Sequence, residues 1–121
     1  MKSYTDIEQS RKLAEILPLE SADMCYPKDA FEYNYAKEPV CHYSGIGLAH
    51  PCWSLATLID IIENIDKTQK VEVSFKHNGG KYWVDVHFDE FGSFCQDHEL
   101  YDSKIDALIA MIENFKNRNL L

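Results

Sequence analysis

Apolar and polar residues alternate on both sides of an Asn-Gly pair in residues 71–88. The segment before the pair reads Val-Glu-Val-Ser-Phe-Lys-His, and the segment after Asn78-Gly79-Gly80 reads Lys-Tyr-Trp-Val-Asp-Val-His-Phe. This alternation predicts a β-hairpin of strands 71–76 and 81–88. We expect its two-residue loop at Asn78-Gly79. A loop at Gly79-Gly80 would keep the same faces and shift the pairing by two residues.

The alternation also assigns the two faces of the hairpin, because side chains along a strand point to opposite sides with a period of two. The first face is apolar and consists of Val71, Val73, Phe75, Tyr82, Val84 and Val86. The second face is polar except for Trp83 and consists of Glu72, Ser74, Lys76, Lys81, Trp83, Asp85 and His87. An isolated hairpin is only marginally stable in water, so other elements must cover the apolar face.

Three segments place apolar residues at helical spacing, and each begins with a capping residue. A helix over 6–17 follows the capping-box sequence Thr5-Asp6-Ile7-Glu8 and ends before Pro18. Ser54 is the expected N-cap of a helix over 54–66, and Ser103 that of a helix over 103–117.

Residues 19–51 show no clear periodicity and contain Pro27, Pro39 and Pro51 among many aromatic residues. Because a structureless loop of this length is improbable in a small domain, we expect an ordered aromatic excursion, with short strands near 22–26 and 39–43. A third strand is expected near 93–101. The predicted fold is a single α+β domain over 1–121, in which a three-stranded antiparallel sheet packs in two layers against helices 54–66 and 103–117.

The formal net charge is -8, from 20 acidic and 12 basic residues. This charge argues against nonspecific binding to nucleic acid or to anionic membranes, and it permits a basic partner. The N-terminus lacks the apolar region of a signal peptide, and no apolar run is long enough to span a bilayer. We therefore expect a cytoplasmic protein whose four cysteines are free thiols.

Cysteines and histidines gather in residues 25–52, where they form a candidate metal site of Cys25, Cys41, His42, His50 and Cys52. Thiolates and imidazoles at tetrahedral spacing are typical zinc ligands. However, these cysteines lack the close C-x2-4-C spacing of structural zinc sites. We expect no cofactor and interpret these residues as buried thiols and loop histidines, with zinc as the alternative.

A second candidate site is the polar face of the hairpin, where Trp83, Asp85 and His87 project from one strand. Asp85 could orient His87 by a hydrogen bond, as in acid–base chemistry. We expect instead a solvated face on which Trp83 is covered by the N-terminal helix or by the aromatic excursion. An exposed Trp83 would be the natural anchor of a binding surface, together with the excursion's Tyr33, Tyr35 and Tyr43.

Several segments are similar to a family of short hypothetical proteins from gut bacteria of the Bacteroidales type, often encoded in phage or mobile-element regions. They are residues 8–13, 19–24, 51–56 and the terminal segment 106–121. The resemblance implies a cytoplasmic accessory protein and carries no activity, cofactor or catalytic residue. We therefore expect a small acidic, non-enzymatic interaction or regulatory module that binds another macromolecule or itself. The alternative is a metal- or small-molecule-binding protein that uses the cysteines and histidines of residues 25–52.

Overall fold

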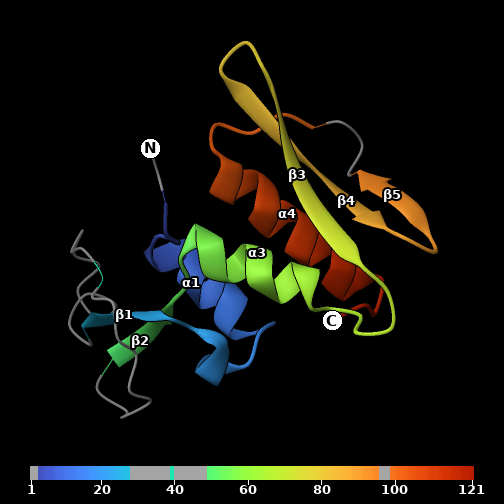
Figure 1. Ribbon diagram of the computed structural model, residues 1–121. Coiled ribbons are helices and arrows are strands. Elements are labelled where there is room, and N and C mark those ends of the chain that lie inside the picture. Colours follow the sequence, from blue (N-terminus) through green and yellow to red (C-terminus); the bar gives the residue numbers. More distant parts are fainter. Residues whose placement is uncertain (1–2, 28–38, 40–48, 96–98) are drawn as a thin grey trace. The chain divides into compact units, whose positions relative to one another are not determined.

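The computed structural model describes residues 3–27, 39, 49–95 and 99–121 (Figure 1). In chain order the elements are α1 (Ile7–Ala14), the 3-10 helix η1 (Leu19–Ser21), β1 (Met24–Pro27), β2 (Ala49–Cys52), α3 (Leu55–Glu63), β3 (Val71–Asn78), β4 (Lys81–Phe88), β5 (Gly92–Cys95) and α4 (Lys104–Asn117). The helices combine with strands that pair antiparallel in both described sheets, which confirms the α+β class. The residues form two compact units, Ser3–Thr57 and Leu58–Leu121. A single domain over 1–121 stays a prediction.

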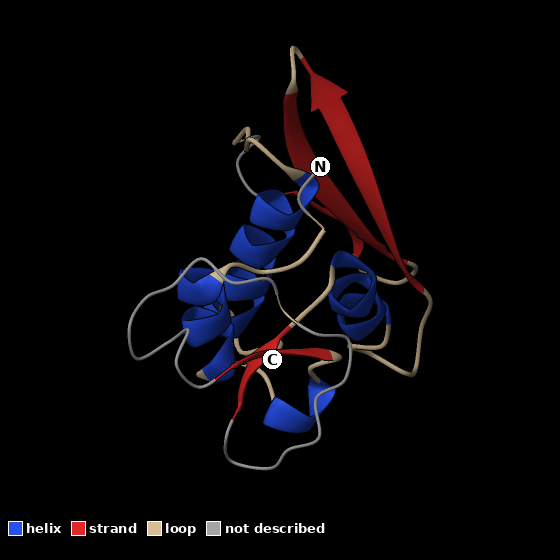
Figure 2. Cartoon of the chain, turned by 90° about the vertical axis from the view of Figure 1, so that its left-hand side faces the viewer, coloured by secondary structure: helices blue, strands red, loops and turns tan. Residues whose placement is uncertain are grey.

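Strands β3 and β4 pair antiparallel over eight residues each, from Val71↔Phe88 to Asn78↔Lys81 (Figure 2). The loop is therefore Gly79-Gly80, and the predicted loop at Asn78-Gly79 is wrong. Gly79 and Gly80 have φ values of 59° and 80°. A type I′ loop needs positive φ at both positions, and two consecutive glycines adopt it without a steric penalty. The predicted division of residues between the two faces is confirmed, because both loops place the same residues on each face.

Helix α4 packs against β4 on the apolar face of this sheet (Figure 1). It begins after Ser103, whose Oγ accepts a hydrogen bond from the Asp106 N–H, as predicted for an N-cap. The Phe115 ring meets the Phe88 ring edge-on, with 6.1 Å between centroids. The buried side chains of the helix are Ile105, Ala107, Leu108, Ile109, Met111, Ile112 and Phe115, and those of β4 are Val84, Val86 and Phe88.

The third strand is shorter than the predicted range 93–101. Strand β5 pairs with β4 from Asp85↔Cys95 to Phe88↔Gly92, and residues 96–98 lie outside the described part of the chain. Tyr101 then pairs with Tyr82 in an isolated bridge, with both N···O distances at 2.8 Å. The described residues also contain a second, two-stranded sheet of β1 and β2, so the predicted three-stranded sheet, which is β3-β4-β5, is one of two.

In the unit Ser3–Thr57, β1 and β2 pair antiparallel from Met24↔Cys52 to Pro27↔Ala49. Strand β1 corresponds to the strand expected near 22–26, whereas residues 40–43 lie outside the described residues and Pro39 is in no strand. Strand β2 was not predicted because it contains Pro51, which removes a backbone donor. Sheets accept proline in edge strands, and both strands of a two-stranded sheet are edge strands of that sheet.

The start of α1 and the ends of α1 and α3 differ from prediction. The N-cap of α1 is Asp6, not Thr5: the Asp6 carboxylate accepts from the Gln9 N–H, and the Gln9 side chain accepts from the Asp6 N–H. The pairs Thr5/Glu8 and Asp6/Gln9 both have the sequence of a capping box. The protein forms the second, and the Thr5 hydroxyl forms the buried hydrogen bonds described below. Helix α1 ends at Ala14 and α3 at Glu63, short of the predicted ends at 17 and 66. Each helix of the described residues is too short or too polar to cross a membrane.

Candidate binding pocket

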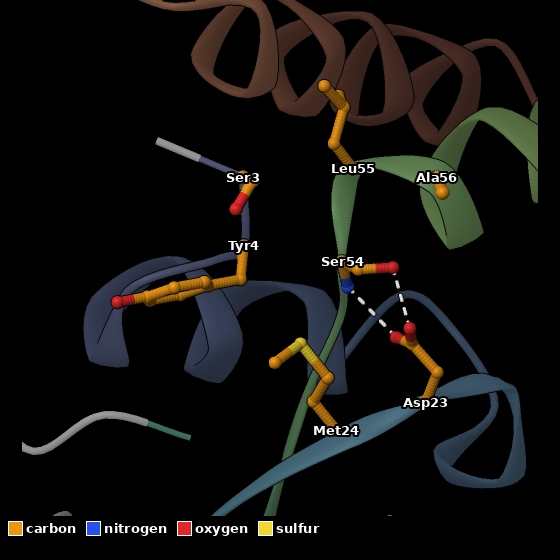
Figure 3. Close-up of a pocket in the computed structure, with 7 residues that line it drawn as sticks. All are labelled: Ser3, Tyr4, Asp23, Met24, Ser54, Leu55 and Ala56. Atoms are coloured by element: carbon orange, nitrogen blue, oxygen red, sulfur yellow. Dashed lines mark hydrogen bonds between the residues drawn. The ribbon is translucent and has the colours of Figure 1, made fainter. Parts of the chain in front are cut away.

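A pocket of about 480 Å³ opens where residues 3–5, here called the N-terminal arm, meet the start of α3 (Figure 3). Backbone hydrogen bonds hold the arm: the Thr5 N–H donates to the Trp53 carbonyl at 2.9 Å, and the Leu55 N–H donates to the Ser3 carbonyl at 2.8 Å. The apolar part of the wall comes from the side chains of Tyr4, Met24, Leu55 and Ala56, and the polar part from Ser3, Asp23 and Ser54. The pocket therefore joins three segments that lie far apart in the sequence.

The charged group in the wall, the Asp23 carboxylate, is bound by Ser54. Its Oδ1 accepts from the Ser54 N–H at 2.9 Å, and its Oδ2 accepts from the Ser54 hydroxyl at 2.6 Å (Figure 3). Ser54 also caps α3, since its Oγ accepts from the Thr57 N–H at 3.2 Å. The carboxylate thus lies near the positive end of the helix dipole, where negative charge is stabilised. A ligand in this pocket meets chiefly apolar side chains.

Tyr4 and Met24 pack against a small core made of Tyr26 and Cys52. A polar network centred on Thr5 crosses this core. The Thr5 hydroxyl accepts from the Trp53 N–H at 3.1 Å and lies 2.7 Å from the Ser10 hydroxyl, while the Thr5 carbonyl accepts from the Tyr26 hydroxyl at 2.7 Å. Thr5 and Ser10 are fully buried. Since buried polar groups need partners, this network fixes the arm that supports the pocket.

Burial raises the pKa of the Cys52 thiol above its ordinary value near 9, although a hydrogen bond from Thr5 partly offsets the effect. Burial likewise raises the pKa of Cys25 and, with a smaller contribution from Cys52, that of Tyr26. At neutral pH both thiols are therefore protonated, and a protonated thiol is a much weaker nucleophile than a thiolate.

These shifts predict that alkaline pH destabilises the protein. A group with a raised pKa in the folded state contributes stability that is complete below its unfolded pKa and is lost as the pH rises. We expect the free energy of unfolding to fall above about pH 9. Urea titrations across this range should show a shallower fall for the double variant Cys25→Ala/Cys52→Ala. An equally steep fall in this variant would show that the thiols are not responsible.

The proposed metal ligands do not all converge. Met24↔Cys52 and Tyr26↔His50 are paired, so Cys52 and His50 lie on one face of the β1–β2 ribbon and Cys25 lies on the other. Cys41 and His42 lie outside the described residues. Within the described part of the chain, no group of three or more metal-binding side chains occurs.

The second predicted site is only partly assembled. Trp83, Asp85 and His87 share one face of the sheet, as expected, and they pair with Lys76, Ser74 and Glu72. Trp83 and Asp85 are half-buried and His87 is exposed, so Trp83 is neither fully covered nor a free anchor. The buried Asp85 Oδ1 has no hydrogen-bond partner in the described structure. Tyr33, Tyr35 and Tyr43 lie outside the described residues.

Comparisons with protein-family models, with curated proteins and with solved structures found no match. The resemblance to short proteins of gut bacteria therefore stays a prediction, and the chemistry of the chain must be judged from its own geometry. Sequence reasoning missed every residue of the pocket as a site residue. No sequence pattern marked these residues, because the pairing of Tyr4 with Ser54 brings distant segments together in the wall.

Proposed function

We propose that the protein is a non-enzymatic interaction module whose pocket receives an apolar side chain from a basic segment of a protein partner. The observation that carries this proposal is the pocket itself, a hollow of about 480 Å³ with a largely apolar wall whose carboxylate is already bound by Ser54. This volume lies within the range of about 300–1,000 Å³ that is typical of ligand pockets.

Charge favours a basic partner segment over an acidic one. The chain has a net charge of -8, and the charged group that lines the pocket is the Asp23 carboxylate. Positive residues flanking the apolar side chain would speed association and would make the affinity depend on salt. We therefore expect an apolar side chain in the pocket and positively charged residues on both sides of it in the partner.

Short synthetic peptides test this proposal on the full chain by calorimetry. The probe carries one leucine flanked by lysines, and two control peptides replace the leucine with alanine or the lysines with glutamates. Because burying leucine instead of alanine contributes about 1.5–3 kcal/mol, we expect the alanine peptide to bind roughly tenfold or more weakly. The glutamate peptide should not bind. Equal affinities for leucine and alanine peptides would contradict the proposal.

Ala56→Trp should block the pocket, because Ala56 is an exposed residue of its wall. The matched control is Leu19→Trp, which adds the same indole to an exposed position of the same unit, outside the pocket. We expect Ala56→Trp to abolish binding of the leucine peptide and Leu19→Trp to leave it unchanged. Similar affinities for both variants would place the peptide elsewhere.

A further inference from the structure

We propose that the outer edge of β3 pairs with the same edge in a second copy of the chain, so that the two sheets join into one continuous antiparallel sheet. This surface lies in the unit Leu58–Leu121, and the proposal does not depend on the pocket.

Strand β3 is an edge strand of the described sheet, whose strand order is β3-β4-β5 (Figure 1). Asn78 and Lys81 flank the two-residue loop, so they form a hydrogen-bonded pair, and every second pair along the ladder does the same. The backbone N–H and C=O groups that point away from β4 are those of Val71, Val73, Phe75 and His77. Tyr82, which pairs with His77, follows the same alternation. Its backbone N–H and C=O point away from β3 and bond to Tyr101.

The edge of β3 has few of the features that keep edge strands apart. Proteins commonly shorten an edge, interrupt it with a bulge, or place proline or charged side chains in it. Strand β3 carries charged side chains, but it runs for eight residues in continuous register and contains no proline. Val73 and Phe75, which carry outward-facing backbone groups, are only half-buried. A second copy would cover both side chains and bond their backbone groups.

The charges of β3 are complementary to those of its own copy. A two-fold axis through Ser74 makes the pairing antiparallel and places Glu72 opposite Lys76 of the second copy, twice by symmetry. The same register places Val73 opposite Phe75 of the second copy on the apolar face. Opposite charges and an aromatic residue facing a β-branched one are both favourable cross-strand pairs. The Glu72 and Lys76 side chains are exposed and therefore accessible to such a partner.

Neighbouring registers lack this match. Moving the axis to Val73 brings Lys70 opposite Lys76 of the second copy, and moving it to Phe75 leaves Glu72 opposite Asn78. Shifting the register between the two copies by one residue is excluded. It would place residues whose backbone groups point toward β4 opposite residues whose backbone groups point away from β4. The charge pattern thus selects one register among those that the hydrogen bonds allow.

Charge reversal tests this register by sedimentation of the full chain. Glu72→Lys and Lys76→Glu each create two like-charge pairs across the edge, and we expect each to weaken the dimer roughly tenfold or more. The combined variant restores two opposite-charge pairs and should recover most of the affinity. The matched control is Asp60→Lys, an exposed position of α3 with the same change in charge as Glu72→Lys, and it should dimerise like the unmodified chain.

Amide hydrogen exchange adds a residue-specific readout. On raising the protein concentration, we expect slower exchange at the amides of Val71, Val73, Phe75 and His77 and no change at Glu72, Ser74 and Lys76. A chain that remains monomeric at about 1 mM would overturn the proposal. Failure of the combined charge variant to recover, or concentration-dependent protection of both residue sets, would overturn the register.

Discussion

Replacing Phe115 with alanine should lower the free energy of unfolding by about 3–5 kcal/mol, the usual cost of removing a large buried aromatic side chain. Phe115 is 0% exposed and meets Phe88 across the contact between α4 and β4. The substitution removes apolar burial and leaves a cavity that the surrounding side chains fill only partly. Urea denaturation followed by circular dichroism measures the loss.

Phe91→Ala is the matched control, because the Phe91 ring also packs against Phe88, with 5.8 Å between centroids. Phe91 is 68% exposed, so its removal leaves no cavity. We expect a loss of less than about 1 kcal/mol, as for most surface substitutions. Equal losses for the two variants would mean that ring contact, not burial of the helix face, holds α4 on the sheet.

Thr5→Val should cost about 1–3 kcal/mol, because it removes a hydroxyl that bonds to two buried groups. The Trp53 N–H, 3.1 Å from the Thr5 Oγ1, loses its acceptor, whereas the Ser10 hydroxyl, at 2.7 Å, keeps its hydrogen bond with Cys52. The side-chain volume is nearly unchanged, so the loss reports hydrogen bonding rather than packing. Trp53 is fully buried in this unit, and its fluorescence can follow the urea transition in a Trp83→Phe background.

Two further variants test whether the loss of stability in Thr5→Val comes from the hydrogen bonds of the Thr5 hydroxyl. Thr5→Ser keeps the hydroxyl and should recover most of the stability that Thr5→Val loses. Ser10→Ala combined with Thr5→Val should cost less than the sum of the single changes, since the two hydroxyls share one hydrogen bond. Strict additivity would contradict the coupling between the N-terminal arm and α1.

Local patterns predicted much of the fold because their signals agree with the tertiary environment. Alternation around the glycines assigned both faces of the β3–β4 hairpin, and Ser54 and Ser103 marked the starts of α3 and α4. The loop position was missed because Asn78-Gly79 and Gly79-Gly80 both suit a type I′ loop. Only the paired strands distinguish the two registers.

The N-cap of α1 could not be predicted for a different reason. Thr5-x-x-Glu8 and Asp6-x-x-Gln9 both have the form of a capping box, and local energies alone do not choose between them. The structure chooses Asp6 because Thr5 bonds to Ser10 and Trp53, and one of these lies far along the chain. A tertiary contact therefore decides a local boundary.

The candidate pocket could not be read from the sequence, because its wall joins residues about 50 positions apart through the antiparallel pairing of Tyr4 with Ser54. No fixed number of residues separates the side chains of such a site, whereas zinc knuckles and phosphate-binding loops have characteristic sequence spacings. From the sequence we identified the cysteines and histidines as a candidate metal site instead. However, the register of β1 and β2 places Cys25 on the opposite face from His50 and Cys52.

The most direct test of the proposed interaction is the methyl resonance of Met24 in the full chain during titration with the lysine-flanked leucine peptide. Met24 lines the pocket, whereas Met111 is 0% exposed in the other unit and serves as an internal reference. We expect a saturable shift of the Met24 methyl, no shift of the Met111 methyl, and loss of the response in Ala56→Trp. A Met24 methyl that does not respond, or that responds equally in Ala56→Trp, would contradict it.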